Sequence, residues 1–125
     1  MESKNLLPVL VLAVSSACFA NSNCDKPVND FDGLYCMNKL FVEADKELNQ
    51  NYAEVVRKLD VEGKSSLKES QLYWIKQRNE QCSRKEKGEF FVNMRCVTEE
   101  TISRSDFLKS RLRECVSSGC RNSKL

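Results

Sequence analysis

Histidine is absent from this chain of 125 residues, and so are the short motifs that usually mark an active site. Histidine is the commonest general base and a frequent zinc ligand, so its absence argues against both kinds of site. The sequence also contains no GxSxG motif, no phosphate-binding loop and no CxxC pair. We therefore expect a protein that is not an enzyme and that holds no metal or cofactor.

Neither sign of charge is in large excess, and no hydrophobic run is long. The chain has 20 basic and 18 acidic residues and a net charge of +2, which is too balanced to predict nucleic-acid binding. Its apolar run from Leu6 to Val14 is interrupted by Pro8 and is well short of the roughly 20 residues that a membrane-spanning helix needs. The expected partner is therefore another protein, with no nucleic acid and no membrane span.

Residues 1–20 are typical of a secretory signal peptide. Lys4 supplies the positive charge, the apolar run follows, and small residues from Ser15 onwards lead to a cleavage site after Ala20. The alternative is a bacterial lipoprotein with a lipid anchor on Cys18, although Ser15 stands where such leaders usually carry a large aliphatic residue. We expect cleavage near Ala20, a periplasmic or secreted product, and one domain over residues 21–125.

What the chain does contain is helical periodicity. Apolar or small residues recur every three or four positions in two stretches, which predicts two amphipathic helices. The stretches are Cys36, Leu40, Ala44, Leu48, Tyr52, Val55 and Leu59, then Leu67, Gln71, Trp74, Arg78 and Cys82. We expect helices over Gly33 to Asp60 and Ser66 to about Lys85, forming an antiparallel hairpin. With a third helix over Asn93 to Cys115, the expected fold is all-α, a small disulfide-stapled bundle of about three helices.

Export gives the cysteines a structural meaning. Cleavage removes Cys18, and an even number of cysteines in an exported domain of about 105 residues indicates a disulfide framework. The six that remain are Cys24, Cys36, Cys82, Cys96, Cys115 and Cys120. Cys115 and Cys120 are expected to pair with each other, and the other four to lie at the open end of the hairpin. There, a Cys36–Cys82 bridge would close a loop of about 46 residues and contribute about 4 kcal/mol in the chain-entropy model.

Local signals suggest how the helices begin and end. Asp30 or Asp32 is expected to cap the first helix, because a carboxylate accepts hydrogen bonds from the free N–H groups of the first turn. Gly63 is expected to make the turn between the helices with a positive φ. Ser66 and Glu69 fit a capping box at the start of the second helix.

Two sets of residues are candidates for a structural or a binding role. Gln71 and Arg78 lie on the inner stripe of the second helix beside Trp74, and Asp45 is the expected polar partner by hairpin geometry. The segment from Ser83 to Gly88 is read as a charged loop. Its basic residues are Arg84, Lys85 and Lys87, and they are a possible contact surface for a partner. Phe90 and Phe91, which follow, are expected to fold back over the open end of the hairpin.

The helical hairpin resembles a known pattern. Its blocks read Ala44-Asp45-x-Glu47-Leu48-Asn49-x-x-Tyr52 and Leu67-x-x-x-Gln71-x-x-Trp74-Ile75-x-x-Arg78-Asn79-x-x-Cys82, with Cys36 before, Cys96 after, and then Thr101-x-x-Arg104-x-x-x-Leu108. This spacing resembles the LprI-type lysozyme-inhibitor domain family of bacterial exported proteins over about Cys24 to Leu112. Asn79 departs from the acidic residue usual in that family, and Cys115 and Cys120 are additional to its common set.

The resemblance implies an exported cell-envelope protein that inhibits lysozyme-type peptidoglycan hydrolases, either by covering the substrate cleft or by presenting a group to the catalytic carboxylates. Two other functions remain open from the sequence. One is a periplasmic immunity protein that neutralises a bacterial effector, and the other is an envelope protein with a structural role. The core motif, by the same resemblance, comprises Asp45, Leu48, Tyr52, Gln71, Trp74 and Arg78.

Overall fold

Three long helices and a short β-hairpin make up the part of the protein that the computed structural model describes, residues 24–125. The proposed signal peptide and Cys18 lie outside this part. The elements in order are α1 (Asp30–Lys58), α2 (Val61–Cys82), β1 (Ser83–Glu86), β2 (Glu89–Val92), α3 (Met94–Ser118) and η1 (Asn122–Lys124). The expected three-helix, largely all-α fold is confirmed.

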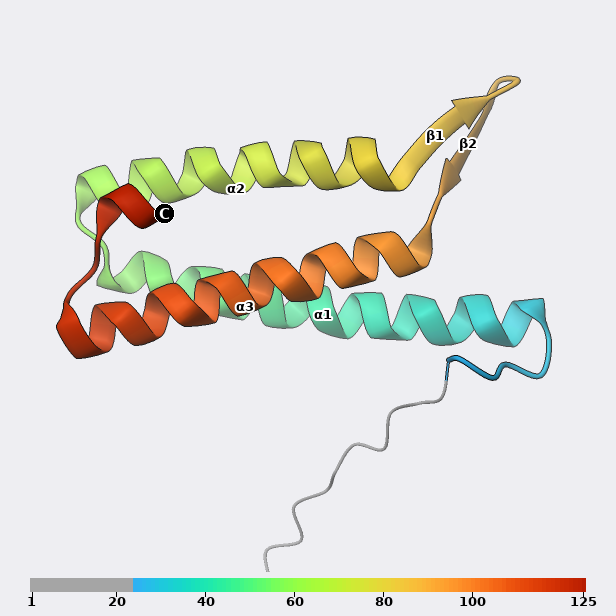
Figure 1. Ribbon diagram of the computed structural model, residues 1–125, viewed down its shortest axis with the longest axis horizontal. Coiled ribbons are helices and arrows are strands. Elements are labelled where there is room, and N and C mark those ends of the chain that lie inside the picture. Colours follow the sequence, from blue (N-terminus) through green and yellow to red (C-terminus); the bar gives the residue numbers. More distant parts are fainter. Residues whose placement is uncertain (1–23) are drawn as a thin grey trace, which may run out of the picture.

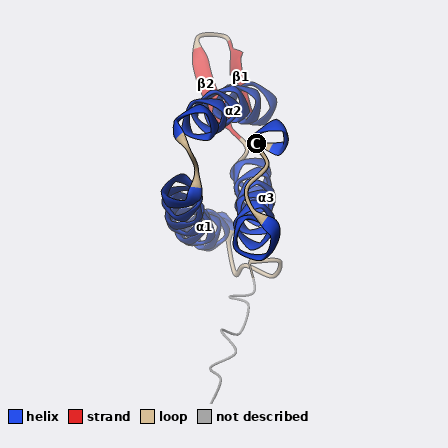
Figure 2. Ribbon diagram, turned by 90° about the vertical axis from the view of Figure 1, so that its left-hand side faces the viewer, coloured by secondary structure: helices blue, strands red, loops and turns tan. Residues whose placement is uncertain are grey.

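The three helices lie side by side, with α2 antiparallel to both α1 and α3 (Figure 1). At one end, α1 runs into α2 and the C-terminus returns; we call this the closed end. At the other, the open end, the β-hairpin links α2 to α3 and α1 begins. Seen along the bundle, α1 and α3 lie next to each other and α2 crosses above them (Figure 2). Most inter-helix contacts join α1 to α3 rather than α1 to α2, so the principal helix pair is not the one that sequence spacing suggested.

The apolar core lies towards the closed end. It consists of Leu48, Val55, Leu59, Leu67 and Leu108, all less than 9% exposed, with Tyr52, Trp74, Phe107, Leu112 and Leu125 packed against it. The members from α1 are spaced by three, four or seven residues, so they project from one side of the helix as the periodicity predicted. Towards the open end, α3 instead buries Thr98, Thr101 and Ser105, so the interior becomes more polar along the bundle.

The caps differ from the prediction. Asn29, rather than Asp30 or Asp32, caps α1, and its Oδ1 accepts from the Asp32 N–H at 2.9 Å. The turn before α2 is also shorter than expected, because Asp60 caps the helix by accepting from the Gly63 N–H at 2.7 Å. The expected capping box at Ser66 is therefore wrong, since that residue already lies within α2.

Gly63 serves close approach rather than a positive φ. It lies in the first turn of α2, and a Cβ built on it would come within 2.5 Å of Asn122 Oδ1 in the C-terminal tail. Asn122 Nδ2 in turn donates to Asp60 Oδ1 at 3.0 Å. A side chain at this position would push the Asn122 amide away from Asp60, so glycine preserves the contact between the tail and the start of α2.

Three disulfides join the six cysteines in sequential pairs. They are Cys24–Cys36, Cys82–Cys96 and Cys115–Cys120. The Cys115–Cys120 pairing is as expected, whereas the Cys36–Cys82 clamp is wrong. The reason is the helix arrangement, since α2 meets α3 at the open end through the β-hairpin, and this brings Cys82 beside Cys96 at a Cα–Cα distance of 5.4 Å.

The charged loop after α2 is instead a β-hairpin. Strands β1 and β2 pair antiparallel from Ser83 opposite Val92 to Glu86 opposite Glu89. The two residues between them, Lys87 and Gly88, have φ values of 51° and 84°, the combination that a type I′ hairpin turn requires. The hairpin points away from the bundle (Figure 1), so the prediction that the phenylalanines fold back over the open end is wrong. Phe90 is 63% exposed.

Candidate partner-binding surface

The family-like motif residues of α2 lie inside the bundle, in a stack of guanidinium groups and aromatic rings. The Arg78 guanidinium lies 4.9 Å from the centroid of the Trp74 ring, and the guanidinium of Arg104 from α3 lies 6.0 Å from the same centroid. Arg104 also lies 4.5 Å from the ring of Phe107, which Arg111 approaches at 5.6 Å. Cation–π contacts of this kind let half-buried arginines replace apolar packing between α2 and α3.

Hydrogen bonds complete this interior layer. Arg104 Nε donates to Gln71 Oε1 at 2.9 Å, and its Nη2 donates to Ser70 Oγ at 2.8 Å. Arg78 donates to Thr101 Oγ1 at 3.3 Å. Burial lowers the pKa of the Arg104 guanidinium below its ordinary value, because desolvation penalises the charged form. These contacts give Gln71 and Arg78 a role in holding α2 against α3.

Asp45 does not take part in this layer, so its predicted role as the polar partner is wrong. Its side chain accepts from Asn49 Nδ2 at 3.2 Å, within α1 itself. Besides Thr101, Arg78 donates to the side chain of Asn79, whose Oδ1 accepts from Nε at 3.2 Å and from Nη2 at 3.0 Å. Leu48, by contrast, is 3% exposed and sits in the core.

The hairpin presents two different faces, because residues directly opposite each other across the strands share a face. One face carries Arg84 and Phe91 together with the two glutamates of the turn. Its Arg84 guanidinium lies 4.8 Å from the Phe91 ring and 3.4 Å from the Glu86 carboxylate. The other face carries Lys85 beside Phe90 and, one pair further along, Val92.

The second face is exposed, apolar and basic at once. Phe90 is 63% exposed and Val92 is 45% exposed. Lys85 lies directly opposite Phe90, and Lys87 follows in the turn at the tip of the hairpin, which projects from the bundle (Figure 1). Exposed aromatic side chains flanked by charge are typical of protein contact surfaces. The structure therefore places Lys85 beside Phe90 and Arg84 beside Phe91, on opposite faces of the hairpin.

The base of the hairpin is fixed. The Cys82–Cys96 disulfide links the end of α2 to the first turn of α3 on either side of it. Next to it, the Asn93 N–H donates to the Cys82 carbonyl at 2.8 Å, and Ser83 Oγ donates to the Asn79 carbonyl at 2.6 Å. A short hairpin held at both strands keeps its shape without a partner, which lowers the entropy cost of binding.

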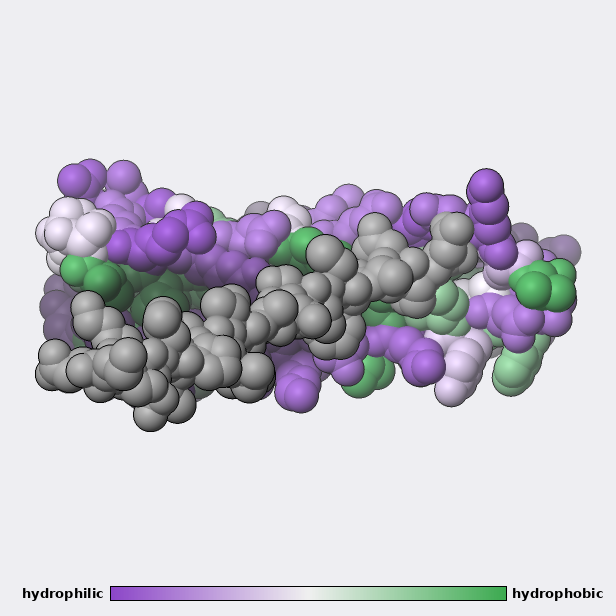
Figure 3. All heavy atoms as spheres, turned by 90° about the horizontal axis from the view of Figure 1, so that it is seen from below, coloured by the Kyte–Doolittle hydropathy of each residue, from purple (hydrophilic) through white to green (hydrophobic). Residues whose placement is uncertain are grey.

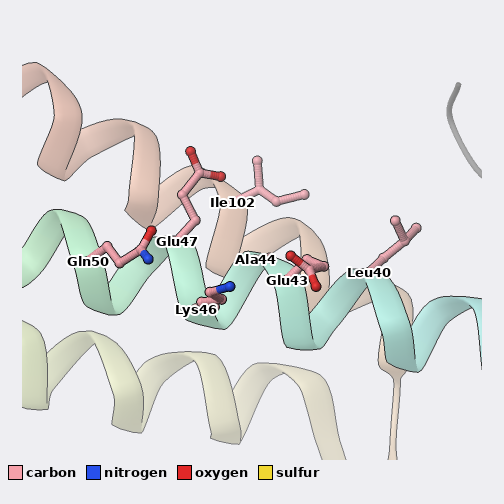
Figure 4. A pocket seen from close by; sticks show the side chains of 7 residues that line it. All are labelled: Leu40, Glu43, Ala44, Lys46, Glu47, Gln50 and Ile102. Atoms are coloured by element: carbon pink, nitrogen blue, oxygen red, sulfur yellow. The ribbon is translucent and has the colours of Figure 1, made fainter. Parts of the chain in front are cut away.

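A second surface feature is a groove of about 600 Å³ along α1, closed on one side by α3. It is lined by Leu40, Glu43, Ala44, Lys46, Glu47, Gln50 and Ile102 (Figure 4). One of its carboxylates is engaged: Glu47 forms an ion pair with Lys109, and this contact raises the pKa of the lysine. The groove follows the line along which α1 packs against α3, so we interpret it as the solvated seam between the two helices.

Two kinds of feature are absent from the part of the chain that the structure describes. Across residues 24–125, the histidine, cysteine and carboxylate side chains form no group of three or more placed to hold a metal ion. In the same range, none of the helices combines the length and apolar character that crossing a bilayer requires.

Comparison with protein-family models matched residues 24–108 to the family described as lysozyme inhibitor LprI. The matched region contains α1, α2, the β-hairpin and the first half of α3, but not the Cys115–Cys120 disulfide. Comparisons with curated proteins and with solved structures gave no match.

Proposed function

The chain belongs to the LprI lysozyme inhibitor family, and on that premise we propose that it is an exported protein that blocks a lysozyme-type peptidoglycan hydrolase by placing its β-hairpin in the substrate cleft. The family is one of inhibitors, which agrees with a role in binding rather than catalysis. Three disulfides support export, because such bonds persist mainly in oxidising compartments.

The observation that carries the proposal is the projecting hairpin with its exposed Phe90 and its basic side chains. Enzymes that hydrolyse glycosidic bonds usually place two carboxyl groups on either side of the scissile bond, within a cleft shaped for a sugar chain. A narrow two-stranded element can enter such a cleft where the whole bundle cannot. Lys85 and Lys87 would then approach the two carboxyl groups, while Phe90 would occupy apolar surface otherwise covered by substrate.

The rigid base of the hairpin supports the same function. An inhibitor that enters an active site competes best when its inserted segment is ordered before binding, since the ordering cost is then already met. The Cys82–Cys96 disulfide and the hydrogen bond from Asn93 to the Cys82 carbonyl supply that order. Leu48, Tyr52, Gln71, Trp74 and Arg78 hold the scaffold in this proposal, and neither they nor Asp45, which contacts only its own helix, touch the hydrolase.

The proposal is tested by inhibition assays with oxidised protein comprising residues 21–125. Its effect on the clearing of a peptidoglycan suspension is measured for several lysozyme types, from animals and from bacteriophages. We expect concentration-dependent inhibition of at least one type, and a Lys85→Glu/Lys87→Glu variant that inhibits at least about tenfold more weakly.

The matched control is Lys64→Glu/Lys68→Glu, which makes the same charge change on exposed positions of α2 at the closed end. It should inhibit like the wild type. Equal losses in the two double variants would show a general charge effect and remove the hairpin from the proposal. An absence of inhibition for every lysozyme type, together with capture of a bacterial effector by the same protein, would instead favour an immunity function.

A further inference from the structure

An exposed apolar strip lies on the first turns of α1, at the open end. Phe31 is 75% exposed, Leu34 59% and Tyr35 55%, and their spacing of three and four residues places them on one side of the helix. With Asn38 and Met94 they line a shallow pocket of about 300 Å³. Hydrophobic side chains are visible at the surface of this end of the molecule (Figure 3).

The strip is ordered and separate from the hairpin. In the view of Figure 1, the first turns of α1 extend beyond the start of α3. The Phe31 and Tyr35 rings are stacked, with centroids 6.3 Å apart and an interplanar angle of 7°. The Cys24–Cys36 disulfide ties the segment before the helix back to α1. Contiguous apolar surface that the monomer leaves exposed usually marks an interaction site.

Charges beside the strip indicate what covers it. Asp32 and Lys39 are seven residues apart, so they lie on the same side of the strip, the acid towards its start and the base towards its end. Neither forms an ion pair with another residue of the described range. The Asp32 carboxylate accepts from Asn29 Nδ2 at 3.2 Å, and the Lys39 ammonium lies 4.9 Å from the centroid of the Tyr35 ring, so both groups have only weak contacts, exposed to solvent, to exchange for an ion pair. If a second α1 is laid antiparallel against the first, Asp32 of each copy faces Lys39 of the other. The strip is thus complementary in charge to itself, which is the requirement for a two-fold symmetric contact.

We propose that two copies of this chain form an antiparallel dimer through the strip of Phe31, Leu34 and Tyr35, with two ion pairs between Asp32 and Lys39 along one edge. In the register that sets Asp32 level with Lys39, Leu34 and Tyr35 of the two copies meet at the centre of the contact and Phe31 lies towards its ends, and the two charge pairs select the antiparallel over the parallel arrangement. Because the strip and the β-hairpin are both at the open end (Figure 1), the two hairpins of a dimer lie near its two-fold axis rather than at its far ends.

The first test measures mass in solution by sedimentation over about 1 µM to 1 mM, the range of affinity typical of small helical contacts. We expect the mass to rise from that of a monomer to that of a dimer. Leu34→Asp should raise the dissociation constant at least about 100-fold, because the symmetric contact loses two leucines and gains two charges. Leu72→Asp, at a 58% exposed position of α2, should leave the dimer intact. Circular dichroism verifies that both variants stay helical.

The second test exchanges the charges. In the dimer of either single variant, Asp32→Lys or Lys39→Glu, positions 32 and 39 of different copies carry the same sign of charge in both pairs. Each variant should therefore dimerise about tenfold more weakly. An equimolar mixture of the two single variants should regain the wild-type affinity, because in the mixed dimer both pairs again join a lysine to an acid. Only a contact between these two residues of different copies produces that recovery.

Several results would overturn the proposal. They are a monomeric mass across the whole range, equal effects of Leu34→Asp and Leu72→Asp, and no recovery on mixing. A monomer whose inhibition is weakened by Leu34→Asp would assign the strip to the hydrolase instead. The Lys85→Glu/Lys87→Glu variant should dimerise normally, so the failure of this proposal and that of the hairpin proposal are distinguished by separate measurements.

Discussion

The two ends of the bundle are built differently. At the closed end, leucine and valine side chains from all three helices are buried, and the C-terminal tail returns to cover them with Leu125. There the Glu114 carboxylate, 15% exposed, is within ion-pair distance of Arg111, Arg121 and Lys124. Towards the open end, Thr98, Thr101 and Ser105 are buried together with Ala44 and Val97, large apolar side chains are exposed, and two of the three disulfides hold the chain together.

This difference separates stability from recognition. Apolar burial supplies the free energy of folding where the helices meet most fully, and the covalent bonds replace it where the surface must stay exposed. A domain of about 100 residues has a small core, so it can leave a hydrophobic end uncovered only if disulfides hold that end in shape. If the two ends differ in this way, substitutions at the closed end should mainly change stability, and changes at the open end should also change binding.

The largest effect is expected from the closed-end core. Leu67 is fully buried, so Leu67→Ala should lower the free energy of unfolding by about 2–5 kcal/mol, through lost burial and the cavity left behind. Chemical denaturation followed by circular dichroism measures this. Leu72→Ala, on the same helix but 58% exposed, should change it by no more than about 0.5 kcal/mol. Equal effects would show that α2 is not packed as described.

The disulfides should differ between the ends. Cys82→Ser/Cys96→Ser removes a bridge with a sequence separation of 14 and should cost about 3 kcal/mol in the chain-entropy model. Cys115→Ser/Cys120→Ser removes one with a separation of 5 and should cost about 2 kcal/mol by the same model. Of the two, only the first should weaken inhibition, because it loosens the base of the hairpin. Loss of inhibition in the second variant alone would assign recognition to the closed end.

The polar layer between the ends should give an intermediate effect. Arg104→Met removes the donors to Gln71 and Ser70 and leaves the buried Gln71 oxygen without its partner, at a cost of about 1–3 kcal/mol in unfolding free energy. Arg113→Met, at an exposed position of the same helix, is the control and should be close to neutral. If both variants behave alike, the stack of arginines and aromatic rings contributes little to holding α2.

The smallest effect is expected from Asp60 and depends on pH. Its pKa is lowered, first by the hydrogen bond from the Gly63 N–H and then by that from Asn122. A carboxyl whose folded pKa is depressed adds stability above its unfolded pKa of about 3.9, and this is lost as the pH falls through the folded value. Asp60→Asn keeps the capping oxygen but cannot titrate.

The melting temperature, measured from pH 7 down to about pH 2.5, should therefore fall more steeply in the wild type than in Asp60→Asn below about pH 4. Glu62→Gln, exposed in the same turn of α2, should follow the wild type. Parallel curves for the wild type and Asp60→Asn would show that the cap is not coupled to folding.

The sequence predicted the helices well because periodicity reports burial on one side of a helix. Leu48, Val55 and Leu67 are buried as the three- and four-residue spacing required. The spacing does not determine which helix packs against which. Trp74 and Arg78 face α3 rather than Asp45 on α1, because the principal contact of α1 is with α3. The wrong Cys36–Cys82 bridge has the same cause, since it assumes that α2 packs mainly against α1, whereas Cys82 bonds to Cys96 of α3.

The hairpin was missed for a different reason. Its strands have four residues each; three of the four in β1 are charged, and three consecutive residues in β2 are apolar. They therefore show neither the hydrophobic alternation nor the length of an ordinary strand. One signal was present in the sequence. Lys87-Gly88 separates the charged segment Arg84-Lys85-Glu86 from a segment that contains Phe90-Phe91-Val92, and a glycine in a two-residue turn is typical of a β-hairpin. Local capping by Asp60 likewise depends on the tail residue Asn122, which is remote in sequence.

The most direct test of the account is hydrogen–deuterium exchange of the oxidised protein, alone and saturated with a lysozyme that it inhibits. We expect the backbone amides of residues 83–92 to gain protection on binding. The closed end, comprising residues 55–67 and 108–125, should exchange equally in both states. Protection confined to the closed end, with the hairpin unchanged, would contradict the claim that this protein is stabilised at one end and binds its partner with the other.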